Sequence, residues 1–539
     1  MQVSNFTIKH KIICVLLFTL LMWMAWPAGG FAPLLFVAWL PLLMLEQQIL
    51  EQKKAGAKVR LFWWSYLAFV LFNLATTWWI YFASGGGMAG AVLANSLLMA
   101  GVFNVFHWVH KRLGDFFGYT MLLVGWMAFE YLHMDWDLSW PWLNMGNGFA
   151  AWADMVQWYE YTGTQGGTMW ILLVNVLLFL LITKVDFRTK KNVVLTTCII
   201  VFPILSSFIL KNKVDDTGKS IEVVVVQPNI DPYNEKFSGM ASSDQINKII
   251  RLAESKITSN TKLVVAPETA IPDAIWLNDM PVHPSVLPFL DFAKKHPKVH
   301  FLSGLTTLEL YTDPAKRSAT ARQISNGEAY YDAYNAATDF YEGTNFPMHY
   351  KSKLVPGVEK MPFPAFFGFF EDYAIDLGGT AGSLGCKKHP TILPIGGGVI
   401  TAPVICYESI YGEYIGDYIQ QGANLICIMT NDGWWENTPG HRQHCQYARL
   451  RAIETRKNVV RSANTGISCF INSKGEISDA TEWWKDDCIR KNMVIHDEQT
   501  FYTRHGDYLG RIACLIVGLL LLMNVLSYFP IGIFKPSNS

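Results

Sequence analysis

Eight long apolar runs are the feature of this sequence that most restricts the folds open to the chain. They lie near residues 11–27, 30–46, 61–83, 86–109, 116–133, 168–183, 193–210 and 511–529. Several approach the ~20 residues that an α-helix needs to cross the hydrocarbon core of a bilayer. Only 16% of the residues are charged, whereas soluble domains carry about 25%. We therefore predict a membrane protein with eight transmembrane helices.

The sequence changes character between the seventh and the eighth run. Residues 211–510 mix polar and apolar side chains and contain no apolar run of 18 residues. We expect a membrane domain of seven helices over 1–210, a soluble domain over 211–510, and an eighth helix with a short tail over 511–539. The small residues 28–30 would also suit the cleavage site of a signal peptide, but six further runs favour a first helix that is retained.

The positions of the basic residues indicate how the predicted helices are oriented. Lysine and arginine gather before the first run and in alternate connections, at Lys9, Lys11, Lys53, Lys54, Lys58, Arg60, Lys111, Arg112, Lys184, Arg188, Lys190 and Lys191. The opposite short connections, 84–86 and 134–167, contain no lysine or arginine. Because basic loops stay in the cytoplasm, we expect the soluble domain on the outer face. In a bacterium this is the periplasmic side of the inner membrane.

Short apolar runs alternate with amphipathic segments throughout the soluble region. Residues 221–230 are rich in valine and predict a buried strand. Isoleucines then recur at helical spacing, which predicts a helix over 243–258 with Ser242 or Ser243 as its cap. This alternation favours an α/β sandwich with mixed sheets.

Three polar residues stand out because each follows an apolar, strand-like run. Glu268 follows KLVVAP, Lys351 follows FPMHY, and Cys406 follows VITAPVI. Ligands collect at strand ends in α/β proteins. Taken singly, the three have ordinary explanations: a capping carboxylate, a solvated lysine and a core thiol. Together they supply a base, a donor to a developing oxyanion and a nucleophile, which acyl transfer requires.

The order of four short motifs gives a closer comparison. PETAIP, YKSKLVPGVE, ICYES and NDGWW follow one another along the chain, and this order resembles the nitrilase, or carbon–nitrogen hydrolase, superfamily with its Glu-Lys-Cys triad. The flanking apolar runs narrow the resemblance to the apolipoprotein N-acyltransferase family. It implies a nitrilase-like αββα sandwich domain carried by eight transmembrane helices.

The resemblance also implies roles for particular residues. Cys406 is expected to be the nucleophile, Glu268 the general base and Lys351 the cation that stabilises the oxyanion. Supporting roles are implied for Glu359, Tyr407 and Glu408, and a part in shaping the lipid pocket for Trp434 and Trp435. One departure is visible: the family commonly reads VPFGE where this chain reads VPGVE. The spacing from lysine to glutamate survives, but the local turn must differ.

The activity implied by the resemblance is transfer of a fatty acyl chain from a membrane phospholipid to an apolipoprotein. The acceptor is the N-terminal α-amine of its S-diacylglyceryl cysteine, and a thioester on the thiol is the intermediate. One alternative is a membrane-tethered amidase or nitrilase that hydrolyses small amides. Another is a transporter or receptor with an inactive nitrilase-like domain.

Other features of the sequence limit the partners that we expect. The net charge is zero, which gives no indication of nucleic-acid binding. HRQHCQYARLRAIETRKN, residues 441–458, predicts a helix on which His441, His444 and Cys445 have a spacing open to metal ligands. We favour an ordinary polar helix start, because a nitrilase-like site needs no metal and no cofactor.

Overall fold

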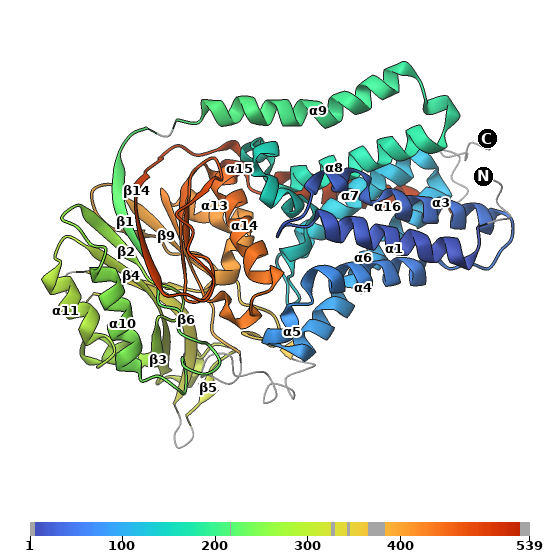
Figure 1. Cartoon of the computed structure of the whole chain (residues 1–539). Helices are drawn as coiled ribbons and strands as arrows, with labels where there is room; N and C mark the ends of the chain where they lie inside the picture. The colour runs from blue at the N-terminus through green and yellow to red at the C-terminus, as the bar shows by residue number, and fades with distance from the viewer. Residues whose placement is uncertain (1–5, 216, 325–328, 342–344, 365–382, 529–539) are drawn as a thin grey trace. The chain divides into compact units, whose positions relative to one another are not determined.

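The computed structural model describes residues 6–215, 217–324, 329–341, 345–364 and 383–528 (Figure 1). Within it the chain divides into two compact units. The helical unit comprises Met1–Ile80, Gly85–Lys211 and Asp507–Ser539, and the sandwich unit comprises Tyr81–Ser84 and Asn212–Gly506. The first unit contains the apolar runs of the sequence apart from residues 81–83, and the second contains most of the mixed region.

Long apolar helices build the helical unit. In the described part of the chain, six segments are long and apolar enough to cross a membrane. They are α1 (Ile8–Ala25), Ala32–Lys54 with α2 (Leu35–Ala38) and α3 (Leu40–Lys54), α6 (Gly85–Leu113), α8 (Tyr159–Thr183), α9 (Lys190–Lys213) and α16 (Tyr508–Leu526). Two further helices, α4 (Leu61–Thr77) and α7 (Asp115–Leu132), coincide with the remaining predicted spans. Every predicted span thus overlaps a helix, while the count of eight crossings stays a prediction.

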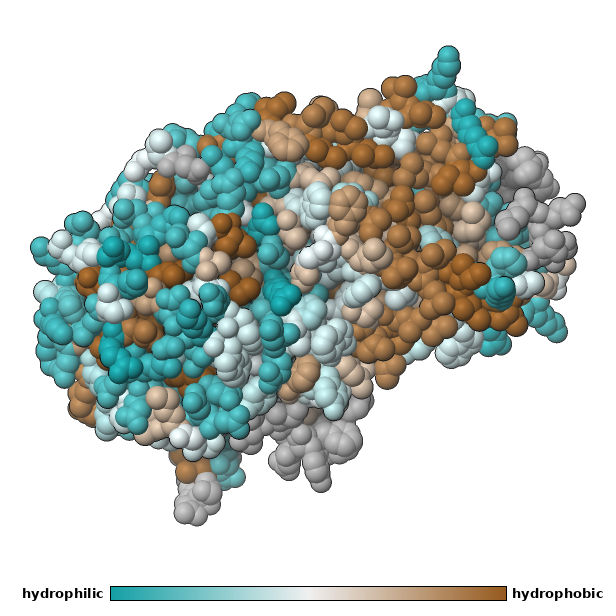
Figure 2. Space-filling view, in the orientation of Figure 1, coloured by the Kyte–Doolittle hydropathy of each residue, from teal (hydrophilic) through white to brown (hydrophobic). Residues whose placement is uncertain are grey.

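The surface of the helical unit is largely apolar. Figure 2 shows hydrophobic residues gathered over its helices. Large apolar side chains such as Leu16, Trp63, Phe202 and Leu515 are exposed. Water would disfavour such a surface by ~25 cal/mol for each Å² of apolar area, whereas lipid chains solvate it. The predicted membrane protein is therefore confirmed, although residues 529–539 of the predicted tail lie outside the described residues.

Two mixed β-sheets form the centre of the sandwich unit. The first has the strand order β14-β1-β2-β4-β6-β5, with β3 paired to β4 and β7 paired to β6. The second has the order β13-β12-β11-β10-β9-β8. The strands of the first sheet are β1 (Ser220–Gln227), β2 (Thr261–Val265), β3 (Ile271–Trp276), β4 (His300–Tyr311), β5 (Arg322–Gln323), β6 (Tyr330–Phe340), β7 (Met348–Tyr350) and β14 (Asp487–Val494). Those of the second are β8 (Leu393–Pro394), β9 (Ile400–Ile405), β10 (Leu425–Thr430), β11 (Asn458–Ala463), β12 (Cys469–Ile471) and β13 (Ile477–Ser478).

Strand β1 shows how the layers are built. Val223 and Val225 join the core between the two sheets, whereas Val224 and Val226 join the core beneath the helices. Burial on both faces explains why this run is continuously apolar rather than alternating. The outer helices are α10 (Ser242–Glu254) and α11 (Leu287–Lys295) on one side, and α13 (Gly412–Gln420) and α14 (Pro439–Thr455) on the other (Figure 1). The unit is therefore a helix–sheet–sheet–helix sandwich.

The start of α10 differs from the prediction. The capping position is Ala241, and no side-chain hydrogen bond caps the helix. Ser242 is already the first helical residue, and its hydroxyl donates to Oδ1 of Asp273 at 2.8 Å. The predicted serine cap is therefore wrong, because the Ser242 hydroxyl contacts Asp273 instead of accepting from a main-chain N–H at the start of the helix.

Candidate active site

The ends of three strands bring Glu268, Lys351 and Cys406 into one buried cluster. Glu268 lies three residues beyond β2, while Lys351 and Cys406 directly follow β7 and β9. The ammonium nitrogen Nζ of Lys351 lies 3.0 Å from Oε1 of Glu268. Both side chains interact electrostatically with the Cys406 thiol. This geometry suits a nucleophile, a base and a cation that act on one substrate carbonyl. We propose these three roles for Cys406, Glu268 and Lys351.

Cys406 occupies a sharp turn out of its strand. Its φ of 49° is in the left-handed region, which side chains other than glycine adopt at a cost of ~1–3 kcal/mol. The turn begins the short 3₁₀ helix η9 (Cys406–Ile410). The main-chain oxygen of Cys406 accepts hydrogen bonds from Oγ of Ser409 at 2.7 Å and Nε2 of His444 at 3.3 Å. These two contacts hold the strained turn in place.

The surroundings of Cys406 keep its sulfur protonated at rest. Burial raises the pKa of the Cys406 thiol well above its usual range, and the negative charge of Glu268 adds to this effect. The positive charge of Lys351 opposes both. A thiol in such a setting becomes a nucleophile only when a base takes its proton, and Glu268 is the neighbouring carboxylate able to do so.

Lys351 is fully enclosed and held by two carboxylates. Its ammonium donates to Glu268 and, at 2.8 Å, to Oε1 of Glu359. Burial alone would lower the pKa of Lys351, but Glu268 and Glu359 outweigh burial and hold that pKa well above its usual value. An ammonium has three N–H bonds, and within the described residues two have acceptors. The third is available to a substrate oxygen.

Asn335 on β6 is a member of the cluster that the sequence did not reveal. Its amide nitrogen Nδ2 donates to Oε1 of Glu268 at 2.8 Å and to Oε1 of Glu359 at 3.3 Å. Its main-chain oxygen accepts from the N–H of Lys351 at 2.8 Å. Asn335 therefore spaces the two glutamates and fixes the backbone of the lysine between them.

The turn after β2 requires a glycine on the neighbouring strand. Thr269, which follows Glu268, has a φ of 45°. A Cβ added to Gly304 on β4 would lie 2.7 Å from the nitrogen of Thr269 and 2.8 Å from Cα of Glu268. The absence of a side chain at Gly304 therefore allows the backbone of Glu268 to approach the sheet.

Glu408 is a structural link rather than a group exposed to substrate. It is completely buried. Burial alone would raise the pKa of Glu408, but His349 and the main-chain donors outweigh burial and lower that pKa. Its Oε1 lies 2.7 Å from the N–H of Ser352 and its Oε2 lies 2.8 Å from the N–H of Ile405. Glu408 thus ties the residue after Lys351 to the residue before Cys406.

The remaining predicted residues lie around this cluster. Tyr407 is buried beside Tyr411, with ring centroids 5.4 Å apart. Trp434 and Trp435 end the 3₁₀ helix η10 (Asp432–Trp435) and are half-buried. The Trp434 ring stacks on Phe237 with centroids 6.4 Å apart, and its main-chain oxygen accepts from the hydroxyl of Tyr233 at 2.8 Å. Trp434 therefore packs against the loop that joins β1 to α10.

A series of buried contacts that begins with an ion pair supports the turn at Cys406. Asp432 accepts from Arg461 at 2.6 Å and pairs with Nδ1 of His444 at 2.9 Å, and Nε2 of His444 reaches the Cys406 carbonyl. His441 instead stacks on Trp483. Among the described residues, no cluster of three or more His, Cys, Asp or Glu could hold a metal. His444 therefore supports the turn at Cys406, a role that its spacing on the predicted helix did not reveal.

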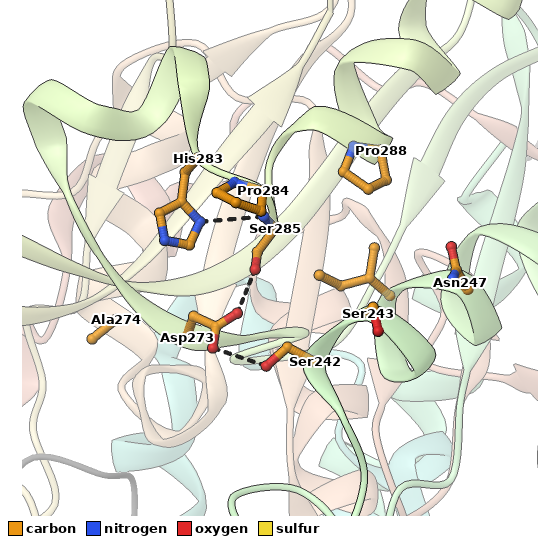
Figure 3. A pocket seen from close by; sticks show the side chains of 10 residues that line it. Ser242, Ser243, Asn247, Asp273, Ala274, His283, Pro284, Ser285 and Pro288 are labelled. Atoms are coloured by element: carbon orange, nitrogen blue, oxygen red, sulfur yellow. Dashed lines mark hydrogen bonds between the residues drawn. The ribbon is translucent and has the colours of Figure 1, made fainter.

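A cavity of about 570 Å³ lies elsewhere in the sandwich unit, beside α10 (Figure 3). In it the Asp273 carboxylate accepts hydrogen bonds from the hydroxyls of Ser242 and Ser285. Of the described residues that line this cavity, none belongs to the Glu268 cluster. This cavity is therefore separate from the cluster at the ends of the strands.

Comparison with known protein families first identifies the class of protein to which the chain belongs. Residues 223–497 match the carbon-nitrogen hydrolase family, which confirms the nitrilase-like α/β sandwich expected from the motifs. Residues 18–177 match the apolipoprotein N-acyltransferase N-terminal domain.

The relatives then define the particular family. The apolipoprotein N-acyltransferase of Chlorobaculum tepidum is 30% identical, over 92% of this chain and 93% of its own length. That of Geobacter metallireducens is 25% identical, over 93% and 92%. The chain belongs to the apolipoprotein N-acyltransferase family, and the expected enzyme class is confirmed with it.

Proposed function

We propose that this protein transfers a fatty acyl chain from a membrane phospholipid to the N-terminal α-amine of S-diacylglyceryl cysteine in apolipoproteins. The observation that carries the mechanism is the Glu268–Lys351–Cys406 cluster, within a chain whose relatives are named for this activity. We propose that residues 1–210 and 511–539 form the membrane part and that residues 211–510 form the catalytic part.

The first half-reaction loads the acyl chain onto the enzyme. Glu268 takes the proton of the Cys406 thiol, and the sulfur forms a bond to the ester carbonyl carbon of the phospholipid. An N–H of Lys351 and nearby main-chain N–H groups stabilise the oxyanion. The ester C–O bond then breaks, the lysophospholipid oxygen receives the proton from Glu268, and a thioester remains on Cys406.

The second half-reaction passes the chain to the amine. The α-amine of the acceptor attacks the thioester carbonyl while Glu268 accepts a proton from its nitrogen. The carbon–sulfur bond breaks, the sulfur regains a proton, and an amide is formed. A thioester suits this exchange because it is reactive toward amines.

The membrane anchoring has a physical reason. Both substrates are lipids, and exposing a fatty chain to water costs ~0.8 kcal/mol for each CH₂ group. An enzyme fixed in the bilayer avoids this cost. The distribution of lysine and arginine supports placing the catalytic domain in the periplasm and the chain in the inner membrane; the supporting observation is the absence of both residue types from 84–86 and 134–167.

Mass spectrometry of the purified full chain tests this function. After incubation with phospholipid, we expect an added fatty acyl mass on the peptide that contains Cys406. A diacylglyceryl lipopeptide with a free α-amine should then remove the acyl group and gain its mass, while an N-acetylated lipopeptide should not. Release of free fatty acid at the same rate with either peptide would instead favour a hydrolase of the amidase type, in which water is the acceptor.

A further inference from the structure

Lys236 is a second buried lysine beside the candidate base. It lies in the loop between β1 and α10, and only 3% of its surface is exposed. Its Nζ donates to the main-chain oxygen of Glu268 at 3.2 Å. Among the described residues this is the only hydrogen-bond acceptor of the ammonium. A charge removed from water in this way is costly unless it compensates another charge.

The loop is built to hold Lys236 in this position. Gln245 on α10 donates through Nε2 to the main-chain oxygens of Lys236 at 2.8 Å and Met240 at 2.9 Å. The main-chain oxygen of Asp231 accepts from the N–H groups of Glu235 and Lys236. Because Asp231 holds the main-chain N–H of Lys236 and Gln245 holds its carbonyl, the lysine side chain is directed toward the main chain of Glu268.

The charges in the cluster show why a second cation matters. The carboxylates of Glu268 and Glu359 both contact Lys351 and both contact the amide nitrogen of Asn335. Lys351 is the cation that these two carboxylates share. The charged groups facing Glu268 from the surrounding elements are Lys351, Glu359, Lys236 and, when ionised, Cys406. Lys236 adds a second ammonium group beside the two carboxylates.

We propose that Lys236 is a positioning residue for the base: its ammonium fixes the main-chain carbonyl of Glu268, and its positive charge keeps the Glu268 carboxylate ionised and able to accept the thiol proton. This inference rests on the proposed function for its catalytic meaning. Burial lowers the pKa of Lys236 to about 8, and Glu268 opposes this effect. The ammonium is therefore largely charged at pH 7.

Labelling with dicyclohexylcarbodiimide tests the proposal without any acyl transfer, because this reagent modifies protonated carboxyl groups. The full chain in detergent is labelled between pH 5 and 9, and the peptide containing Glu268 is quantified by mass spectrometry. In Lys236→Met we expect the midpoint of labelling to move to higher pH by about one unit, a ~10-fold increase at fixed pH above it. Lys236→Arg should keep the wild-type midpoint.

Lys457 provides a matched control. It is also completely buried, and its ammonium likewise donates to main-chain oxygens, those of His496 and Glu498. Lys457→Met should leave the Glu268 labelling midpoint unchanged. An equal shift in Lys457→Met, or an unchanged midpoint in Lys236→Met, would overturn the proposal.

Kinetics separate a positioning role from a merely structural one. In Lys236→Met the acid limb of the pH dependence of acyl-enzyme formation should move up with the labelling midpoint, while the phospholipid concentration for half-maximal rate stays the same. If Lys236→Met does not fold, Lys236→Arg decides: a raised midpoint there, with charge retained, contradicts the proposal. A labelling shift without any wild-type acyl-enzyme would leave this inference standing and refute the proposed function.

Discussion

Oε1 of Glu359 lies 2.8 Å from Nζ of Lys351, eight residues earlier in the chain. The short turn between them is closed by the N–H of Val355, which donates to Oε2 of Glu359 at 2.8 Å, and by Gly357 with a φ of 77°. The unusual order VPGVE thus keeps the glutamate within reach of the lysine, because the glycine supplies the left-handed residue that the turn needs.

Removal of the sulfur should prevent acyl-enzyme formation altogether. In Cys406→Ala we expect no fatty acyl mass on the peptide containing residue 406, and in Cys406→Ser almost none, because Glu268 would have to deprotonate a much weaker acid. Intact-mass measurement after incubation with phospholipid checks both variants. An acylated Cys406→Ala protein would show that another residue is the nucleophile.

Loss of the oxyanion donor should slow acylation without preventing binding. For Lys351→Ala we expect a decrease of roughly 10²–10³-fold in the rate of acyl-enzyme formation, the effect of losing one such donor. Glu359→Gln keeps a hydrogen-bond acceptor beside Lys351 and should cost less. Quenched-flow sampling with mass detection gives both rates. Equal losses in the two variants would mean that Glu359 does more than orient the lysine.

The link made by Glu408 should make the fold sensitive to acid. The pKa of Glu408 is lowered in the folded state, while an unfolded glutamate titrates near ~4.3. The stabilisation is therefore complete above about 4.3 and is lost as the pH falls from there through the lower folded pKa. Asp432 acts in the same direction, since Arg461 and His444 outweigh burial and lower its pKa.

Thermal unfolding of the full chain between pH 7 and pH 3 measures this sensitivity. Glu408→Gln should unfold at lower temperature at pH 7, because its amide NH₂ leaves one of the two buried main-chain N–H groups without an acceptor, at a cost of ~1–3 kcal/mol. It should also lose less stability on acidification than the wild type. The same acid dependence in both proteins would contradict the role given to Glu408.

The ring of Trp434 should affect recognition of the donor more than chemistry. Trp434→Ala removes the partner of Phe237 and Tyr233 and should raise the phospholipid concentration at half-maximal acylation by about 10-fold, which corresponds to ~1.4 kcal/mol. The maximal acylation rate should change little. A variant with unchanged concentration dependence but slower chemistry would exclude a part in lipid binding.

The sequence was most informative where strands end. Glu268, Lys351 and Cys406 each follow an apolar run, and such runs reveal strands without any knowledge of how they pair. Asn335 was missed because it lies within β6, where a polar residue in an alternating strand has no distinctive signal. Asp432, His444 and Arg461 were missed as a group because their pairing depends on η10, α14 and β11 meeting in space. Arg456 also ends α14 in a left-handed conformation, so the predicted helix over 441–458 stops three residues early.

The link through Glu408 bears on any attempt to redesign this enzyme. Because one carboxylate clamps the strand end that carries Cys406 to the loop that carries Lys351, the reacting sulfur and the oxyanion donor keep their spacing when residues outside the clamp are exchanged. Phe237 and Trp434 lie outside it. Libraries that aim at new acyl lengths should therefore diversify these aromatic positions and leave the clamp untouched.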